Sequence, residues 1–194
     1  MQYEKASDTE LIEKFKTGDK LAFDILMERH FRAVMNLIYR FTGCTGREAE
    51  DMAQEVFLRI YRALPRFEAR AKFFTYLYKV TMNLCLKERT AISRDKNKLV
   101  SIDENWEDSD APRLNIADPK GTPQDELERQ ELCERVRQAV LDLPEEQRAA
   151  VILYRYKELS YEETAEALGI TLPAVKSRLH RAKLALKKAL AEYK

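Results

Sequence analysis

Cysteine and long apolar runs are scarce in this chain, and their scarcity excludes several classes of protein. Cys44, Cys85 and Cys133 are far apart and form no CxxC pair, which argues against a disulfide framework or a thiolate zinc site. No apolar run approaches the roughly 20 residues that cross a bilayer, and the polar start MQYEKASDTE lacks the apolar core of a signal peptide. We therefore expect a soluble protein of the reducing cytoplasm, with no membrane insertion.

Histidine is equally scarce, and this argues against an enzyme. Only His30 and His180 occur, and no nucleophile stands at a spacing that would pair with either of them. No group of potential ligands has the spacing of a metal site, so we expect no metal and no cofactor. The many acidic and basic pairs are typical of solvated helix faces.

The chain has almost no net charge and few residues that break helices. Charged residues make up 35% of it but nearly cancel to +1, so any nucleic-acid binding must come from local segregation of charge. There are five glycines and six prolines, and Pro112, Pro119 and Pro123 fall in one acidic stretch from about Ser93 to Gln124. That stretch has no helical apolar period, so we expect a flexible acidic linker.

Helical periodicity flanks the linker on both sides. Leu21, Ile25 and Leu26 illustrate the spacing, and no sustained alternation of apolar and polar residues occurs. The expected fold class is therefore all-α, with two small helical bundles joined by the flexible acidic linker. We place the divisions at 1–92, 93–124 and 125–194. A coil of about 30 residues spans about 30 Å on average, so the bundles can reach sites one or more turns of DNA apart.

The C-terminal bundle carries the pattern of a helix-turn-helix. Ser160 followed by Glu163 forms a capping box, which predicts a helix that begins at the residue after the serine. Gly169 ends this helix, because glycine accepts the left-handed backbone of a C-cap. Thr171 and Pro173 then start a second helix.

The second helix separates an apolar stripe from a basic surface. From Thr171 onward seven Lys or Arg residues face one acid, Glu192, which suits the major groove of DNA. The alternative is a solvated basic face on an ordinary helical hairpin. The inner stripe consists of Val175, Leu179, Ala182 and Leu186. The side chains assigned to base edges and adjacent phosphates are Lys176, Ser177, His180 and Arg181, and those assigned to phosphates are Arg178 and Lys183.

A helix in the N-terminal bundle combines acidic and apolar groups on one face. In the segment AEDMAQEVFLRIYRALPRF, helical spacing brings together Asp51, Gln54, Glu55 and Leu58. The ordinary explanation is a helix N-terminus enriched in acids, which the helix dipole favours.

Aromatic and basic residues alternate in the next segment, RFEARAKFFTYLYKVTMNLCLKERT. Flat rings offer stacking surfaces worth about 1 to 3 kcal/mol per unpaired base, while cations follow the strand backbone. For Phe74, Leu77 and Val80 we favour burial in the core. The segment 67–72 follows Pro65 and lacks an apolar stripe, so we expect a loop able to receive a flipped base.

The order of these features resembles that of the two-domain extracytoplasmic-function sigma factors. The segment DMAQEVFLRIYRAL is similar to their polymerase-binding helix through Asp51, Gln54, Glu55, Val56 and Phe57. The resemblance covers about residues 8–91 and 126–191. Two positions depart from the family pattern: Tyr76 stands where Trp is frequent, and Lys87 where an acid is common.

The resemblance implies a protein that carries core RNA polymerase to promoter DNA. Residues 1–92 would be sigma region 2, docking on the clamp coiled coil of the largest polymerase subunit, and residues 125–194 would be sigma region 4, which also meets the polymerase flap. An anti-sigma factor is a further expected partner. The implied polymerase-binding residues are Asp51, Gln54, Glu55, Val56, Phe57 and Leu58. Those implied for minus-ten DNA are Phe67, Arg70, Lys72, Phe73, Tyr76, Lys79 and Asn83. Those implied for minus-thirty-five DNA are Thr171, Lys176, Ser177, Arg178, His180, Arg181 and Lys183.

Two alternatives stay open at this point. An ordinary helix-turn-helix regulator would bind duplex DNA without polymerase, but it would leave the Gln54–Glu55 helix and the aromatic segment without a role. The acidic linker either mimics nucleic-acid charge in a polymerase channel or serves as a soluble tether.

Overall fold

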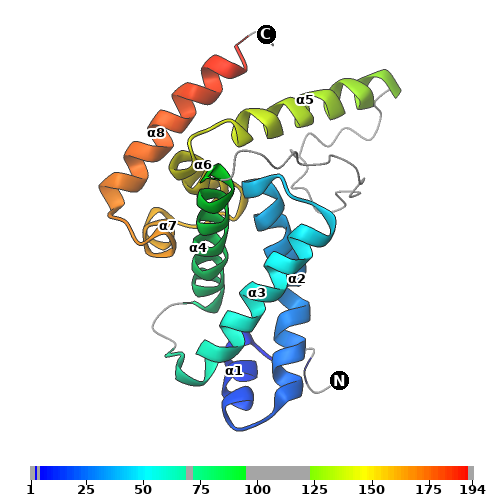
Figure 1. Cartoon of the computed structure of the whole chain (residues 1–194), viewed down its shortest axis with the longest axis vertical. Helices are drawn as coiled ribbons and strands as arrows, with labels where there is room; N and C mark the ends of the chain where they lie inside the picture. Colours follow the sequence, from blue (N-terminus) through cyan, green and yellow to red (C-terminus); the bar gives the residue numbers. More distant parts are fainter. Residues whose placement is uncertain (1–2, 4, 69–71, 95–122, 192–194) are drawn as a thin grey trace. The chain divides into compact units, whose positions relative to one another are not determined.

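The computed structural model describes residues 3, 5–68, 72–94 and 123–191, and all regular structure within them is helical (Figure 1). The predicted all-α class with two helical bundles is therefore confirmed. Helices α1 to α4 lie in an N-terminal unit, and α5, α6, most of α7 and α8 lie in a C-terminal unit. Residues 95–122, which include most of the expected linker, lie outside the described residues. None of the described helices is long and apolar enough to cross a membrane.

The N-terminal unit is built around α2, which packs against the helices before and after it. Its core is lined by apolar side chains from several helices, among them Phe41, Ile60 and Met82, all almost fully buried. The elements of this unit are α1 (Asp8–Lys16), α2 (Lys20–Thr42), α3 (Gly46–Ala63), the 3-10 turn η1 (Leu64–Arg66) and α4 (Phe73–Arg94).

Local capping sets the ends of the first two helices. Ser7 and Glu10 form a capping box at the start of α1, and the Asp19 side chain accepts a hydrogen bond from the backbone N–H of Leu21 at the start of α2. At the other end of α2, Gly43 has φ of 78°, the left-handed conformation that glycine adopts without strain. The chain turns there into α3.

Asp8 ties α1 to α2. Its two carboxylate oxygens lie 2.7 Å from Nη1 of Arg29 and 2.7 Å from Nε2 of His30. Burial by itself raises the pKa of Asp8, but the hydrogen bonds from His30 and Arg29 outweigh it and hold the pKa below the ordinary value.

This contact predicts an acid-dependent contribution to stability. Because the folded-state pKa of Asp8 is depressed, its stabilising effect is present above the unfolded value of about 3.9 and is lost as the pH falls through the folded value. We expect Asp8→Asn to lower the free energy of unfolding at neutral pH by on the order of 1 kcal/mol. In urea unfolding at about pH 3, the difference in free energy of unfolding between the variant and the parent should be smaller than at neutral pH. A larger difference in acid would contradict this account.

The C-terminal unit comprises four helices and an irregular turn. Its core includes Val140, Ile152 and Val175, which are at most 4% exposed. Buried Arg148 donates hydrogen bonds to the backbone carbonyls of Leu141 and Leu143, so its guanidinium satisfies carbonyls at the C-terminal end of α5. The elements are α5 (Pro123–Leu141), α6 (Glu145–Val151), the π-helical turn η2 (Ile152–Tyr156), α7 (Tyr161–Leu168) and α8 (Leu172–Ala189).

The helix-turn-helix has the boundaries that its capping residues predict. The backbone N–H of Ser160 donates to the Glu163 carboxylate at 2.9 Å, and the backbone N–H of Glu163 donates to the Ser160 hydroxyl at 3.1 Å. Helix α7 begins at the next residue after the serine, and Gly169 ends it with φ of 64°. The Thr171 hydroxyl caps α8 by accepting from the N–H of Ala174.

Candidate nucleic-acid interface

The outer face of α3 presents the polar residues that the sequence predicts there. Asp51 and Gln54 are exposed, and Leu58 is 43% exposed, unusual for a large apolar side chain. Glu55 is half-buried and accepts a hydrogen bond from Nε of Arg59 at 2.7 Å. One turn of helix spacing separates these positions, so they form one continuous surface, here called the α3 face.

Two members of the predicted polymerase-binding set do not lie on the α3 face. Val56 is fully buried and Phe57 is 5% exposed, because the apolar stripe of α3 packs against α2. They position the helix and offer little surface to a partner. Phe57 stacks on Phe31 of α2 at a centroid distance of 6.3 Å, and Phe31 is 36% exposed. Phe31, which was not among the predicted residues, adds an exposed ring beside Phe57.

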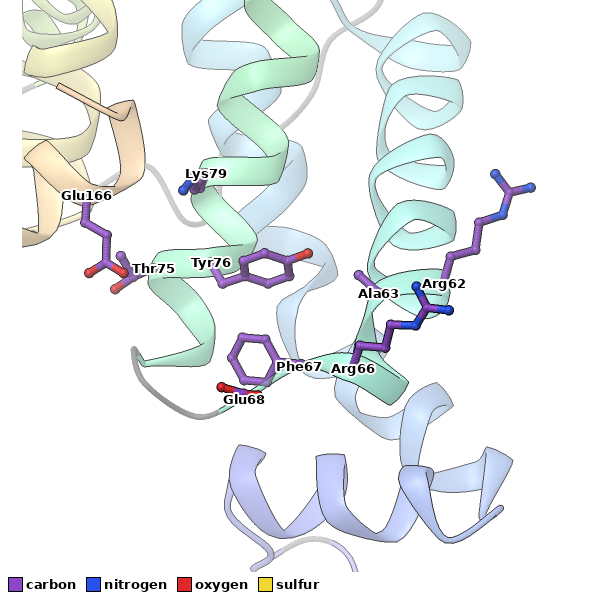
Figure 2. A pocket seen from close by; sticks show the side chains of 9 residues that line it. All are labelled: Arg62, Ala63, Arg66, Phe67, Glu68, Thr75, Tyr76, Lys79 and Glu166. Carbon is purple, nitrogen blue, oxygen red and sulfur yellow. The ribbon is translucent and has the colours of Figure 1, made fainter.

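An aromatic cluster joins the end of η1 to the first turns of α4 (Figure 2). The ring of Phe67 lies 5.1 Å from that of Tyr76 and 6.1 Å, edge-on, from that of Phe73. Phe73 is only 7% exposed and packs behind Phe67, so in this structure it offers little ring surface, and its predicted contact with DNA stays a prediction. Phe67 and Tyr76 remain half-exposed, and burial raises the pKa of the Tyr76 hydroxyl.

The buried ring of Phe73 is also connected to α1 through His30. His30 meets it edge-on at a centroid distance of 5.4 Å, and the same imidazole is hydrogen-bonded to Asp8. Of the three residues that we expected in the core, Leu77 is fully buried, whereas Phe74 and Val80 are half-buried.

Cations line the same hollow as the two accessible rings. Figure 2 shows Phe67 and Tyr76 between Arg66 and Lys79, while the side chain of Arg62, which also lines the hollow, extends away from the rings. Arg62 was not among the predicted site residues. Its position one helical turn before Arg66, at the end of α3, was a signal that could have identified it.

The other predicted minus-ten residues lie at the edges of this surface. Lys72 is exposed directly before α4, and its ammonium lies 5.3 Å from the centre of the Phe74 ring. Asn83 is exposed two turns after Tyr76 on the same face of α4. Arg70 lies outside the described residues, as do the other residues in the middle of the expected loop.

The basic surface of α8 matches its prediction closely. Val175 and Ala182 of the inner stripe are fully buried, and Leu179 and Leu186 pack on the cluster of Leu143, Val151 and Ala182. The hydroxyl of Thr171 is engaged in capping the helix. The predicted contact residues that are exposed on the outer side are Lys176, Ser177, His180, Arg181 and Lys183.

Arg178 differs from the other cations of α8. It is half-buried, and its Nη2 lies 3.0 Å from a carboxylate oxygen of Glu146 on α6. The pair joins α8 to α6, so Arg178 also helps to hold these two helices together. Its assignment to a phosphate stays a prediction.

Neither metal chemistry nor thiol chemistry is supported by the described residues. They contain no group of three or more His, Cys, Asp or Glu side chains that could hold a metal ion. Cys44 and Cys85 are buried, and burial raises the pKa of Cys85 to about 12, which leaves almost no thiolate at neutral pH. Only Cys133 is exposed among the described cysteines.

Comparison with protein families gives two matches, one in each unit. The family described as Sigma-70 region 2 matches residues 26–94. The family described as Sigma-70, region 4 matches residues 133–186. The first match contains the α3 face and the aromatic cluster, and the second contains the helix-turn-helix.

Curated relatives align along nearly the whole chain. The RNA polymerase sigma-H factor of Pseudomonas aeruginosa is 34% identical over 185 residues, which cover 94% of this chain and 93% of that protein. The ECF RNA polymerase sigma factor SigW of Bacillus subtilis is 32% identical over 183 residues, which cover 93% and 95%.

Solved structures show the same fold. CnrH, in complex with the cytosolic domain of CnrY, is similar with a TM-score of 0.66 and 22% identity over 96% of this chain and 99% of that chain. The sigma factor RpoE of Bartonella quintana, in complex with the anti-sigma factor NepR, is similar with a TM-score of 0.65 and 19% identity over 89% and 98%.

Proposed function

The chain belongs to the extracytoplasmic-function sigma factors, the promoter-specificity subunits of bacterial RNA polymerase, and on that basis we propose how each of its two units acts in initiation. Proteins of this family direct promoter-specific transcription initiation and do no covalent chemistry of their own. The N-terminal unit binds core polymerase and captures opened minus-ten DNA. The C-terminal unit reads the minus-thirty-five element as duplex.

The α3 face is the proposed docking surface for core polymerase. It combines the exposed Asp51, Gln54 and Leu58 with the half-buried Glu55, an arrangement of acidic, amide and apolar groups that suits a basic and apolar partner. The partner surface is the clamp coiled coil of the largest subunit. The flap is the expected contact of the C-terminal unit.

The aromatic cluster is the proposed site for the opened minus-ten strand. Phe67 and Tyr76 offer ring faces on which unpaired bases stack, and Arg62, Arg66 and Lys79 lie where a strand backbone would pass. A protein that binds only duplex DNA needs no such surface. This combination of accessible rings and cations is the observation that carries the proposed function.

An anti-sigma factor is the proposed regulatory partner. The Bartonella quintana RpoE structure holds one. In this chain, large apolar side chains are exposed in both units, with Leu58 43% and Leu184 55% exposed. A bound inhibitor that covers such residues would keep the protein from polymerase and from DNA.

Run-off transcription with core polymerase on a promoter library tests the proposed function as a whole. We expect the purified full chain to give start-site selectivity, because recruitment, recognition and strand opening are all required for a defined transcript. A protein that binds duplex promoters but never yields a defined transcript with core enzyme would be the helix-turn-helix regulator instead.

The basic surface of α8 allows a sharper prediction about base reading. Arg181 is exposed on the outer side of the helix, where its guanidinium can grip guanine O6 and N7. We expect Arg181→Ala to cost about 1 to 3 kcal/mol at one base position and to relax discrimination there. Competition binding of the holoenzyme to single-base variants of the minus-thirty-five element measures this.

Lys183→Ala is the matched control. Lys183 is exposed on the same helix and is assigned to a phosphate, so its loss should weaken binding to all sequences equally and reduce the salt slope by about one. If Arg181→Ala behaves in the same uniform way, the assigned base contact is wrong.

A further inference from the structure

Two tyrosines of the C-terminal unit form a ring stack that no predicted site uses. The rings of Tyr154 and Tyr161 lie 4.7 Å apart and are inclined by only 10°. Tyr154 belongs to the π-helical turn η2, and Tyr161 is the first residue of α7. Both side chains are half-buried.

Irregular backbone brings the two rings together. In η2 the helix widens to a π turn, which moves Tyr154 out of the regular α-helical series. The chain then reverses through Glu158, a non-glycine residue with φ of 54°, and the N–H of Leu159 donates to the carbonyl of Leu153 at 3.2 Å. A left-handed residue outside glycine costs free energy, so the surrounding packing must hold this connection in place.

The stack extends to the DNA-reading helix through a cation. The ammonium of Lys176 on α8 lies 5.7 Å from the centre of the Tyr161 ring, within the range of a cation–π interaction. A hydrogen bond with the Tyr161 side chain raises the pKa of the Tyr154 hydroxyl above its ordinary value. The three groups form a continuous series from η2 through α7 to α8.

We propose that the stacked Tyr154 and Tyr161 are positioning residues that hold the Lys176 ammonium in a fixed place for promoter DNA, and so help to determine base specificity. This inference rests on the proposed function of α8. A free lysine is a flexible point charge that suits any phosphate, whereas a lysine held on a ring loses less conformational entropy on binding and reaches fewer positions. Holding Lys176 therefore converts a general cation into one with a defined target.

A double-mutant cycle in the full chain, bound to core polymerase, tests the proposal. Tyr161→Leu removes the ring, Tyr161→Phe keeps it, and Lys176→Ala removes the cation. The measurement is competition binding to duplexes that differ at single minus-thirty-five base pairs, repeated over a range of salt concentrations. Thermal unfolding of each variant verifies that it is folded.

We expect Tyr161→Leu to reduce discrimination at one base pair by about 2- to 5-fold, the size of an exposed cation–π interaction, with the salt slope unchanged. Tyr161→Phe should retain discrimination. In the Lys176→Ala background, Tyr161→Leu should have no further effect on it. Tyr154→Leu removes the other ring of the stack and should give the same pattern. It therefore tests the proposal even if Tyr161→Leu does not fold.

The positioning role would be overturned if Tyr161→Leu reduced base discrimination equally with and without Lys176. It would also be overturned if Tyr161→Leu weakened binding to every duplex by the same factor. Failure of the proposed function would be recognised separately, because the unmodified protein itself would then give no promoter-specific transcript with core enzyme.

Discussion

Replacing Gln54 and Glu55 together by Lys is expected to lower the affinity of the protein for core polymerase by at least about tenfold, which is about 1.4 kcal/mol. Both side chains lie on the α3 face, with Gln54 exposed and Glu55 half-buried beside Arg59. Two lysines there place like charges against a basic partner surface, and charge reversal at an interface costs more than simple loss of a contact. Binding of labelled protein to core enzyme measures the effect.

Helix α5 offers a matched control for this double variant. Gln130 and Glu131 repeat the same pair of residue types, both are exposed, and Glu131 forms an i,i+4 ion pair with Arg135, as Glu55 does with Arg59. Reversal of Gln130 and Glu131 to Lys therefore changes charge and helix pairing equally. If this control weakens polymerase binding as much as the α3 variant does, the docking surface is misplaced.

Tyr76→Leu is expected to lower initiation from duplex promoters by about 5- to 150-fold. The ring of Tyr76 packs against Phe67 and lies beside Lys79 in the hollow of Figure 2. Loss of one stacking platform removes about 1 to 3 kcal/mol of strand capture, and opening of the minus-ten region depends on that capture. Abortive transcription from duplex and from pre-opened templates measures it. The deficit should shrink when the minus-ten bases are mismatched beforehand.

Two further variants separate stacking from folding. Tyr76→Phe keeps the ring and should remain active. Tyr78→Leu removes a half-buried ring two residues further along α4, where it packs against Phe74 at 6.0 Å and takes no part in the aromatic cluster. Equal defects in Tyr76→Leu and Tyr78→Leu, or an undiminished defect on pre-opened DNA, would show that Tyr76 acts only through the stability of the unit.

Local signals made the C-terminal unit the more predictable part of the chain. The boundaries of the helix-turn-helix follow from Ser160, Glu163, Gly169 and Thr171, each of which acts on backbone within a few residues. The same reasoning identified the buried stripe of α8. By contrast, the ion pair between Arg178 and Glu146 joins residues far apart in the sequence, and no local pattern indicates it.

In the N-terminal unit, sequence patterns did not predict which of the candidate side chains are buried. Spacing correctly identified the exposed residues of the α3 face, but family resemblance added Val56 and Phe57, whose burial depends on how α3 packs against α2. Phe73 lies in the segment where aromatic and basic residues alternate, and neither that pattern nor the family resemblance distinguishes an accessible ring from one that supports it. The tyrosine stack was missed because it depends on a π turn, which tertiary packing decides.

Asp8 and Phe73 hold the same imidazole, that of His30, between them. Through these contacts, helix α1 supports the rings that are proposed to bind single-stranded DNA. Asp8 lies outside the residues proposed to contact DNA, so its substitution should impair promoter opening while leaving promoter choice unchanged. The efficiency of promoter opening can then be changed without changing which promoter is selected.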